Sequence, residues 1–210
     1  MSEKKFDFRK EYKDLYMPKD QPVLIDVPSM IFIYVDGQGS PDSAAYSNSI
    51  QALYSLTYSI KMSKMSGNQP EGYFEYVVPP LEGLWYMDDG FDINKRDEWK
   101  WRSMIRQPEF VTKEAFDRAM EECRRKKPEI DLSNVGYTEW TEGLCVQIMH
   151  TGPFSEEPKS IAKIDLYLKN NNLEADLKND RKHHEIYLSD PRKTAPEKLK
   201  TVLRIPVIQH

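Results

Sequence analysis

The segment His184–Pro191 carries a carboxylate and a phenol two residues apart in a run of β-forming residues. Successive side chains of a strand point to opposite faces, so Glu185 and Tyr187 share one face while Ile186 and Leu188 share the other. If the aliphatic face packs under helices, Glu185 and Tyr187 face a ligand cleft, where desolvation strengthens the attraction of a carboxylate for a cation. Glu185 could equally act as a general base or acid. The alternative is a solvated sheet face, with Tyr187 filling cross-strand space.

Aromatic side chains are numerous enough to wall such a cleft, since their rings stack on flat ligands and attract cations. Trp99 and Trp101 alternate through Lys100, so both can face one side of a strand. Core packing is the alternative for each aromatic. The candidate ligand-binding residues, with a methionine as an adaptable wall and a second carboxylate, are Tyr34, Tyr73, Trp85, Trp99, Trp101, Met149 and Glu82.

Other kinds of site lack the residue spacing they need. The adjacent His183 and His184 point to opposite faces of a strand, and no HExxH or other metal-binding spacing occurs, so we expect no metal site. The sequence contains no glycine-rich nucleotide motif and no GxSxG motif, and we expect no cofactor. Cys123 and Cys145 form no CxxC motif and fit a reducing compartment.

Composition narrows the partners and the location. The 210 residues carry a net charge of -4, without the basic excess typical of nucleic-acid binders, so no direct nucleic-acid binding is expected. The charged segment Met1–Asp20 lacks the apolar stretch of a signal peptide. The longest strongly apolar run, Met30–Val35, is far shorter than the ~20 residues of a membrane span. We therefore expect a cytoplasmic protein that binds a small molecule and no membrane.

The order strand, turn, helix, strand, strand occurs twice in the hydrophobic pattern, which predicts an α+β fold of two β-α-β-β repeats. Two antiparallel sheets would then frame a central ligand cleft. The predicted first copy comprises 30–35, 42–62, 72–78 and 81–88, and the second 143–149, 155–169, 183–189 and 199–208. The predicted organisation is an N-terminal arm (1–22) and a single domain (23–210), with repeat one at 28–90, an insert at 91–140 and repeat two at 141–208.

The stretch Glu-x-Tyr-Leu-x-Asp-Pro at 185–191 resembles the final signature of the GyrI-like small-molecule-binding domain family. Gly37, Gly39 and the run His150–Phe154 support the resemblance, which covers about residues 20–208. It implies two SHS2-like units, in agreement with the repeat. It also implies amphipathic, aromatic and cationic ligands, answered by an acidic residue at Glu185.

The resemblance supports three functions. Some stand-alone members are associated with hydrolytic opening of cyclopropane rings in DNA-alkylating natural products, and here Glu185 and Tyr187 would be catalytic. A binding module that only sequesters such compounds needs the same residues, so both functions stay open. The alternative is an interaction protein, such as a DNA gyrase inhibitor or a ligand-sensing partner of a transcription regulator. The helix-turn-helix of the regulator members is not expected in this chain.

Overall fold

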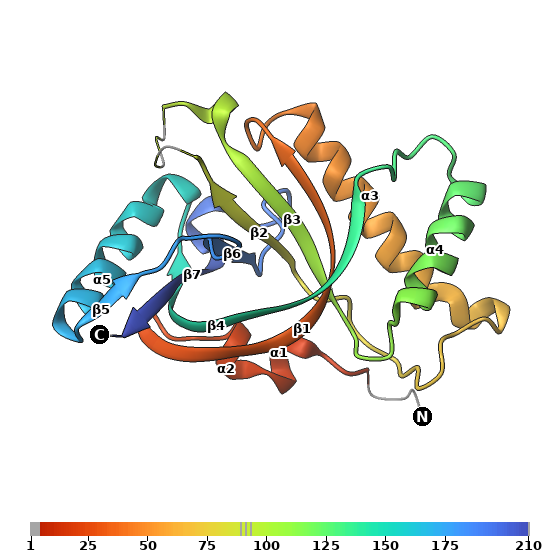
Figure 1. Ribbon diagram of the computed structural model, residues 1–210, viewed down its shortest axis with the longest axis horizontal. Coiled ribbons are helices and arrows are strands. Elements are labelled where there is room, and N and C mark those ends of the chain that lie inside the picture. Colours follow the sequence, from red (N-terminus) through yellow and green to blue (C-terminus); the bar gives the residue numbers. More distant parts are fainter. Residues whose placement is uncertain (1–4, 89, 91, 93, 210) are drawn as a thin grey trace. The chain divides into compact units, whose positions relative to one another are not determined.

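The computed structural model describes residues 5–88, 90, 92 and 94–209. It is a mixed α/β structure in which the strands of the sheet pair antiparallel. The chain divides into two compact units, which we describe separately (Figure 1). The first unit comprises Met1–Phe8, Met30–Pro79 and Tyr86–Trp140, and the second comprises Arg9–Ser29, Pro80–Trp85 and Thr141–His210. Among the described residues, no helix has the length and apolar character needed to cross a membrane.

The first unit packs a long helix against a strand pair. Ile31 of β1 lies opposite Gln107 of β3, and Gln38 lies opposite Lys100. Ser43 and Thr112 are the N-cap residues of α3 and α4. Their hydroxyls accept hydrogen bonds from backbone N–H groups in the first turn of each helix, as serine and threonine commonly do at this position. Its elements are part of β1 (Val23–Gln38), α3 (Ala44–Met62), η1 (Ser63–Ser66), η2 (Arg96–Glu98), β3 (Lys100–Gln107), α4 (Lys113–Lys126) and the start of β4 (Val135–Thr151).

The strand predicted over 72–78 is not formed. This segment makes only an isolated bridge between Tyr76 and Phe6, and its aromatic side chains pack on Phe110 instead. The strand that follows β2 is β3, inside the segment predicted as an insert. The pattern hid β3 because Ser103 and Gln107 are polar yet fully buried, which breaks the apolar alternation that marks a half-buried strand.

The second unit is a small antiparallel sheet with a helix on one face. Within the unit, β7 pairs with β4 along one edge and with β6 along the other, and β6 also pairs with β2. The short β5 pairs with the C-terminal end of β7. Its elements are most of α1 (Phe8–Glu11), α2 (Lys13–Tyr16), the start of β1, β2 (Leu81–Tyr86), the rest of β4, η3 (Phe154–Glu156), α5 (Glu157–Asn170), β5 (Leu173–Ala175), β6 (His183–Tyr187), η4 (Pro196–Lys198) and β7 (Lys200–Gln209).

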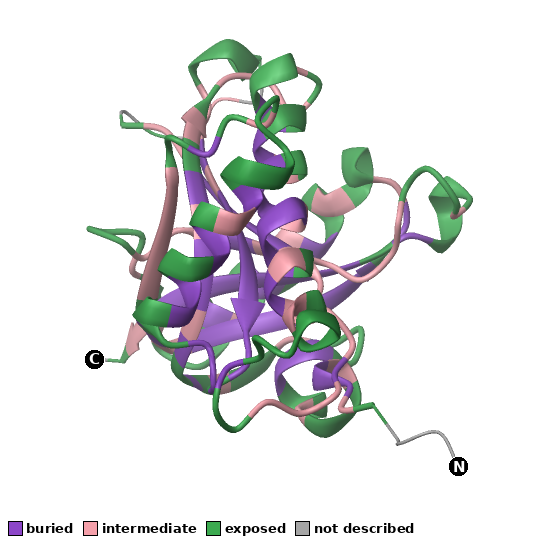
Figure 2. Ribbon diagram, turned by 90° about the vertical axis from the view of Figure 1, so that its right-hand side faces the viewer, coloured by how far each residue is buried: buried purple, intermediate pink, exposed green. Residues whose placement is uncertain are grey.

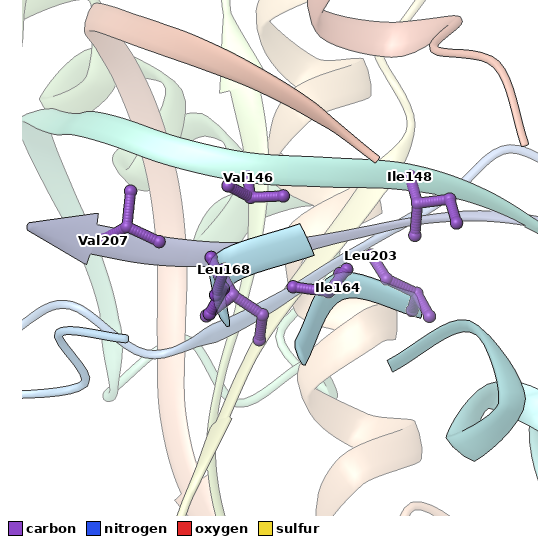
Figure 3. Packing of buried hydrophobic residues seen from close by; sticks show 7 residues of the cluster. Val146, Ile148, Ile164, Leu168, Leu203 and Val207 are labelled. Atoms are coloured by element: carbon purple, nitrogen blue, oxygen red, sulfur yellow. The ribbon is translucent and has the colours of Figure 1, made fainter. Parts of the chain in front are cut away.

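Each face of this sheet is covered by a different segment. Helix α5 packs on one face through an aliphatic cluster (Figure 3), which consists of Val146, Ile148, Ile164, Leu168, Leu203, Ile205 and Val207. The opposite face is covered by the arm, where Leu15 and Tyr16 are buried. Figure 2 shows the buried residues concentrated on the strands, while the helices present exposed residues outward. Burial of this apolar surface is what holds α5 on the sheet.

Candidate functional site

Strands β2 and β6 place three facing pairs of residues on the face that α5 covers, the first being Leu81 and Tyr187. Gly83 lies opposite Glu185 and Trp85 lies opposite His183 in the antiparallel register. Facing residues, and residues two apart, share a sheet face. Tyr187, two residues beyond Glu185, therefore joins this group. The register thus brings an indole, an imidazole, a phenol and a carboxylate together on one surface.

A chain of hydrogen bonds links these groups. Trp85 Nε1 donates to the Tyr187 hydroxyl at 2.8 Å, and that hydroxyl donates to Glu185 Oε2 at 2.8 Å. The other carboxylate oxygen, Oε1, lies 3.1 Å from His183 Nε2. Both oxygens of Glu185 are therefore held, and the tyrosine proton is directed toward the carboxylate because the indole occupies its acceptor side.

The N-terminal end of α5 brings a second carboxyl group to Glu185. His150, on β4, anchors this end through Nδ1 to the Ser160 hydroxyl at 3.0 Å and Nε2 to the Pro153 carbonyl at 3.2 Å. Phe154 then lies edge-on to Tyr187, with ring centroids 6.0 Å apart. Glu157, the first residue of the helix, interacts electrostatically with Glu185.

Glu157 holds its proton more tightly than an ordinary glutamate. Burial, followed by the negative charge of Glu185, raises the pKa of Glu157 to about 9. Among the described residues, Oε1 of Glu157 is buried and has no hydrogen-bond partner. At neutral pH Glu157 therefore keeps its proton and can act as a proton donor next to Glu185. Pairs of acids whose environments separate their proton affinities are suited to supplying an acid and a base together.

Gly83 leaves the space that this hydrogen-bond chain requires. A Cβ atom added there would lie 3.0 Å from Trp85 Nε1 and 3.1 Å from the Tyr187 hydroxyl, which is tighter than ordinary contact. We expect Gly83→Ala to separate the two groups and to cost roughly 1 kcal/mol of unfolding free energy, the usual worth of one hydrogen bond. The Trp85 indole N–H signal in an NMR spectrum, identified by its loss in Trp85→Phe, should shift. An unchanged signal would contradict the close contact.

The sequence places the chain in a family. The model of the GyrI-like small molecule binding domain matches residues 20–208, nearly the whole chain. The chain belongs to this family. A search of curated proteins finds no match.

Solved structures support this placement of the GyrI-like domain. A crystal structure of an uncharacterized conserved protein from Listeria innocua is 50% identical, with TM-score 0.94, covering 97% of this chain and 100% of that chain. A hydrolase from Listeria innocua is 49% identical, with TM-score 0.90 and coverage of 97% and 100%. The EcmrR C-terminal domain is 13% identical, covers 90% of this chain and 98% of that one, and shares the fold alone at TM-score 0.53.

Three of the residues predicted for the site lie together in the GyrI-like domain, namely Trp85, Glu185 and Tyr187. Glu82 and Met149 belong to the same unit but to the opposite face of the sheet. Glu82 alternates with Gly83 along β2, and Met149 reaches the same face through the register of β4 with β7. Both side chains are buried there.

The other four predicted residues lie in the first unit, each with partners inside it. The Tyr34 ring is stacked under Arg102, whose guanidinium carbon is 4.0 Å from the ring centroid. Tyr73 donates to the Lys61 carbonyl, and Trp99 Nε1 donates to a backbone carbonyl, that of Asp92. Trp101, which is 2% exposed, packs edge-on against Tyr46 of α3. The site described above uses none of these four.

Sequence reasoning missed Glu157, His183 and Phe154. Glu157 follows the run His150–Phe154 that carries part of the family resemblance, but acidic residues are common in the first turn of any helix. Nothing in its spacing separates it from a residue that complements the helix dipole. His183 was expected on the face opposite His184, and the register confirms this. Its bond to Glu185 could have been inferred from their i, i+2 spacing on one strand.

Proposed function

We propose that the chain binds small, amphipathic, aromatic or cationic compounds and hydrolyses strained electrophiles, such as cyclopropane-bearing DNA-alkylating natural products. The observation that carries the proposal is the carboxyl pair of Glu157 and Glu185, in which Glu157 has a raised pKa and, among the described residues, a buried oxygen without a hydrogen-bond partner. The similarity to a Listeria hydrolase at 49% identity supports hydrolysis. The rings of Tyr187 and Phe154 suit flat ligands, since Phe154 is 43% exposed and Tyr187 is half-buried, whereas Trp85 is buried behind them in the hydrogen-bond chain.

The proposed reaction adds one water molecule across the strained ring. Glu185 accepts a proton from the water as its oxygen bonds to a ring carbon. The carbon–carbon bond of the ring breaks, and its electron pair passes to a conjugated carbonyl oxygen of the ligand. Glu157 donates its proton to that oxygen, and proton transfer from Glu185 to Glu157 restores the pair. Tyr187 holds Glu185 in place through its 2.8 Å hydrogen bond.

The architecture and location form part of the proposal. The order strand, helix, strand, strand occurs as β1, α3, β2, β3, and again as β4, α5, β6, β7 with the short β5 inserted between α5 and β6, which supports two SHS2-like repeats. Helix α4 belongs to the segment between β3 and β4. Two free, buried cysteines, Cys123 and Cys145, suit the cytoplasm.

The test is incubation with a cyclopropane-bearing aromatic alkylating compound, followed by mass spectrometry. Wild type should yield a product heavier by one water molecule. Glu185→Gln should slow its formation by roughly 10²–10⁴-fold, the usual contribution of a general base. Glu197→Gln, an exposed carboxylate on η4, is the matched control and should react like wild type.

Two other outcomes separate the candidate functions. Tight binding of the intact compound by wild type, weakened in Glu185→Gln, would make the protein a sequestering module. Equal product formation by wild type and Glu185→Gln would remove the carboxyl pair from the mechanism.

A further inference from the structure

Behind the site, on the opposite face of the same strands, lies a buried group of four ionisable side chains. His184 is 0% exposed, and its Nδ1 lies 3.0 Å from Glu142 Oε2, while its Nε2 lies 2.9 Å from Glu82 Oε2. Arg204 Nη1 donates to the same Glu142 oxygen at 2.9 Å. We call Glu82, Glu142, His184 and Arg204 the reverse-face network. Two acids and two bases balance its charge.

The network shares its backbone with the site. His184 stands between His183 and Glu185 on β6, and Glu82 immediately precedes Gly83 on β2. The Glu82–His184 contact is a diagonal one across the two strands, since Glu82 faces Ile186 in the register. The residues of that contact are therefore bonded directly to residues of the site, namely Gly83 on β2 and Glu185 on β6.

While Glu82 and Glu142 are both ionised, only the doubly protonated form of His184 can donate a hydrogen bond to each of them. A neutral imidazole has one N–H donor and one acceptor nitrogen, whereas the imidazolium donates at both nitrogens. With carboxylates at both nitrogens, loss of the proton leaves one carboxylate facing a nitrogen lone pair in a dry interior. A buried charge without its partner is strongly unfavourable, so the surrounding strands must adjust.

The charged and titratable groups that surround His184 among the described residues come from several elements of the unit. Glu82 comes from β2, Glu142 from β4 and Arg204 from β7, and Tyr16 of the arm donates to Glu82 at 3.4 Å. The Cys145 thiol, also on β4, is buried and interacts electrostatically with Glu142. Burial lowers the pKa of His184, but the charge and hydrogen bond of Glu142, and then those of Glu82, outweigh it and raise that pKa to about 9.

We propose that His184 is a positioning residue whose imidazolium, clamped between Glu82 and Glu142, holds β2 and β6 in the register that aligns Trp85, Tyr187 and Glu185. Its deprotonation releases the clamp and sets an alkaline limit on the site. The activity part of this inference rests on the proposed function. The structural part does not, because it concerns the hydrogen bond between Trp85 and Tyr187 alone.

The structural test follows the Trp85 indole N–H signal by NMR from pH 6 to pH 10, without ligand. Nitrogen-15 signals of the His184 ring are recorded in the same samples. Wild type should show both sets of signals changing together. Glu82→Gln removes one of the two carboxylates that favour the imidazolium, so both transitions should move to lower pH, by about one unit or more. Glu197→Gln, the control, should match wild type.

Three results separate the inference from the proposed function. An indole signal that stays constant while His184 titrates would overturn the positioning role, and wild type alone suffices for this even if Glu82→Gln fails to fold. Coupled transitions in a protein that hydrolyses no compound would support the positioning role and remove the hydrolase function. Hydrolysis with the same alkaline limit in wild type and Glu82→Gln would support the function and overturn the positioning role.

Discussion

Glutamine in place of Glu157 should make the protein more stable at pH 8 and, at the same time, inactive in hydrolysis. Burial and the charge of Glu185 raise the pKa of Glu157 to about 9 in the folded chain, whereas in the unfolded chain this pKa has its ordinary value of 4.5. A carboxyl pKa raised by folding means that the native state binds more protons, so stability falls as pH rises between these two values. Glutamine does not titrate and escapes this loss. Thermal unfolding at several pH values measures the difference.

The expected gain at pH 8 is about 1–3 kcal/mol, after allowing for relaxation of the site around the charge. It should shrink as pH falls and vanish below about pH 4.5, where both states of wild type are protonated. Glu156→Gln, the neighbouring exposed carboxylate, should show no such pH-dependent gain. A Glu157→Gln variant less stable than wild type at pH 8 would show that the folded protein tolerates the ionised form of Glu157. Glu157 could then not serve as the proton donor of the proposed reaction.

Replacement of Arg204 by methionine should strongly destabilise the second unit. Arg204 is 1% exposed and donates to Glu142, to Gln147 Oε1 and to the Leu15 carbonyl. Removing one partner of a buried ion pair costs about 3–5 kcal/mol, because the remaining charge stays buried. For a chain of this size that corresponds to a fall of roughly 10 °C in the unfolding temperature.

Differential scanning calorimetry at pH 7 gives this shift directly. Arg192→Met is the matched control, because Arg192 also pairs with a carboxylate, Asp190, but its side chain is 84% exposed. Exposed pairs contribute about 0–1 kcal/mol, so the control should unfold close to wild type. Equal unfolding temperatures for the two variants would mean that the reverse-face network is not a structural element of the fold.

The sequence pattern predicted the parts of the site that lie on one strand. Alternation along 183–187 placed Glu185 and Tyr187 on one face, and the register confirms it. The expectation that Ile186 would lie under the helix was wrong, because Glu185 pairs with Leu203 on the face that α5 covers, and Ile186 lies on the opposite face. The same reasoning could not find Glu157, because its approach to Glu185 depends on how α5 packs on the sheet. Packing of this kind depends on the aliphatic cluster and on His150, which are contacts between residues far apart in sequence.

Buried polar residues explain the other differences between prediction and structure. Glu82 was expected as a second carboxylate of a ligand cleft, but its charge is matched by His184 on the other face. No local pattern shows that two charges more than a hundred residues apart neutralise each other. Strand β3 was missed for the same reason. Ser103 and Gln107 are polar but buried, whereas a prediction from hydrophobic periodicity assumes that polar side chains are exposed.

The N-terminal arm limits how far the chain can be shortened from its N-terminus. The family match begins at residue 20, which invites expression of a shortened chain from that point. Such a chain would lack the carbonyl of Leu15, which accepts from Arg204, and that of Asp14, which accepts from Gln147. Both donors are buried, so the shortened chain would leave them without these hydrogen-bond acceptors. It would also expose the surface that Tyr16 covers. The folding unit therefore begins before residue 20, where the family match starts, because it includes the helical turn that carries Asp14 and Leu15.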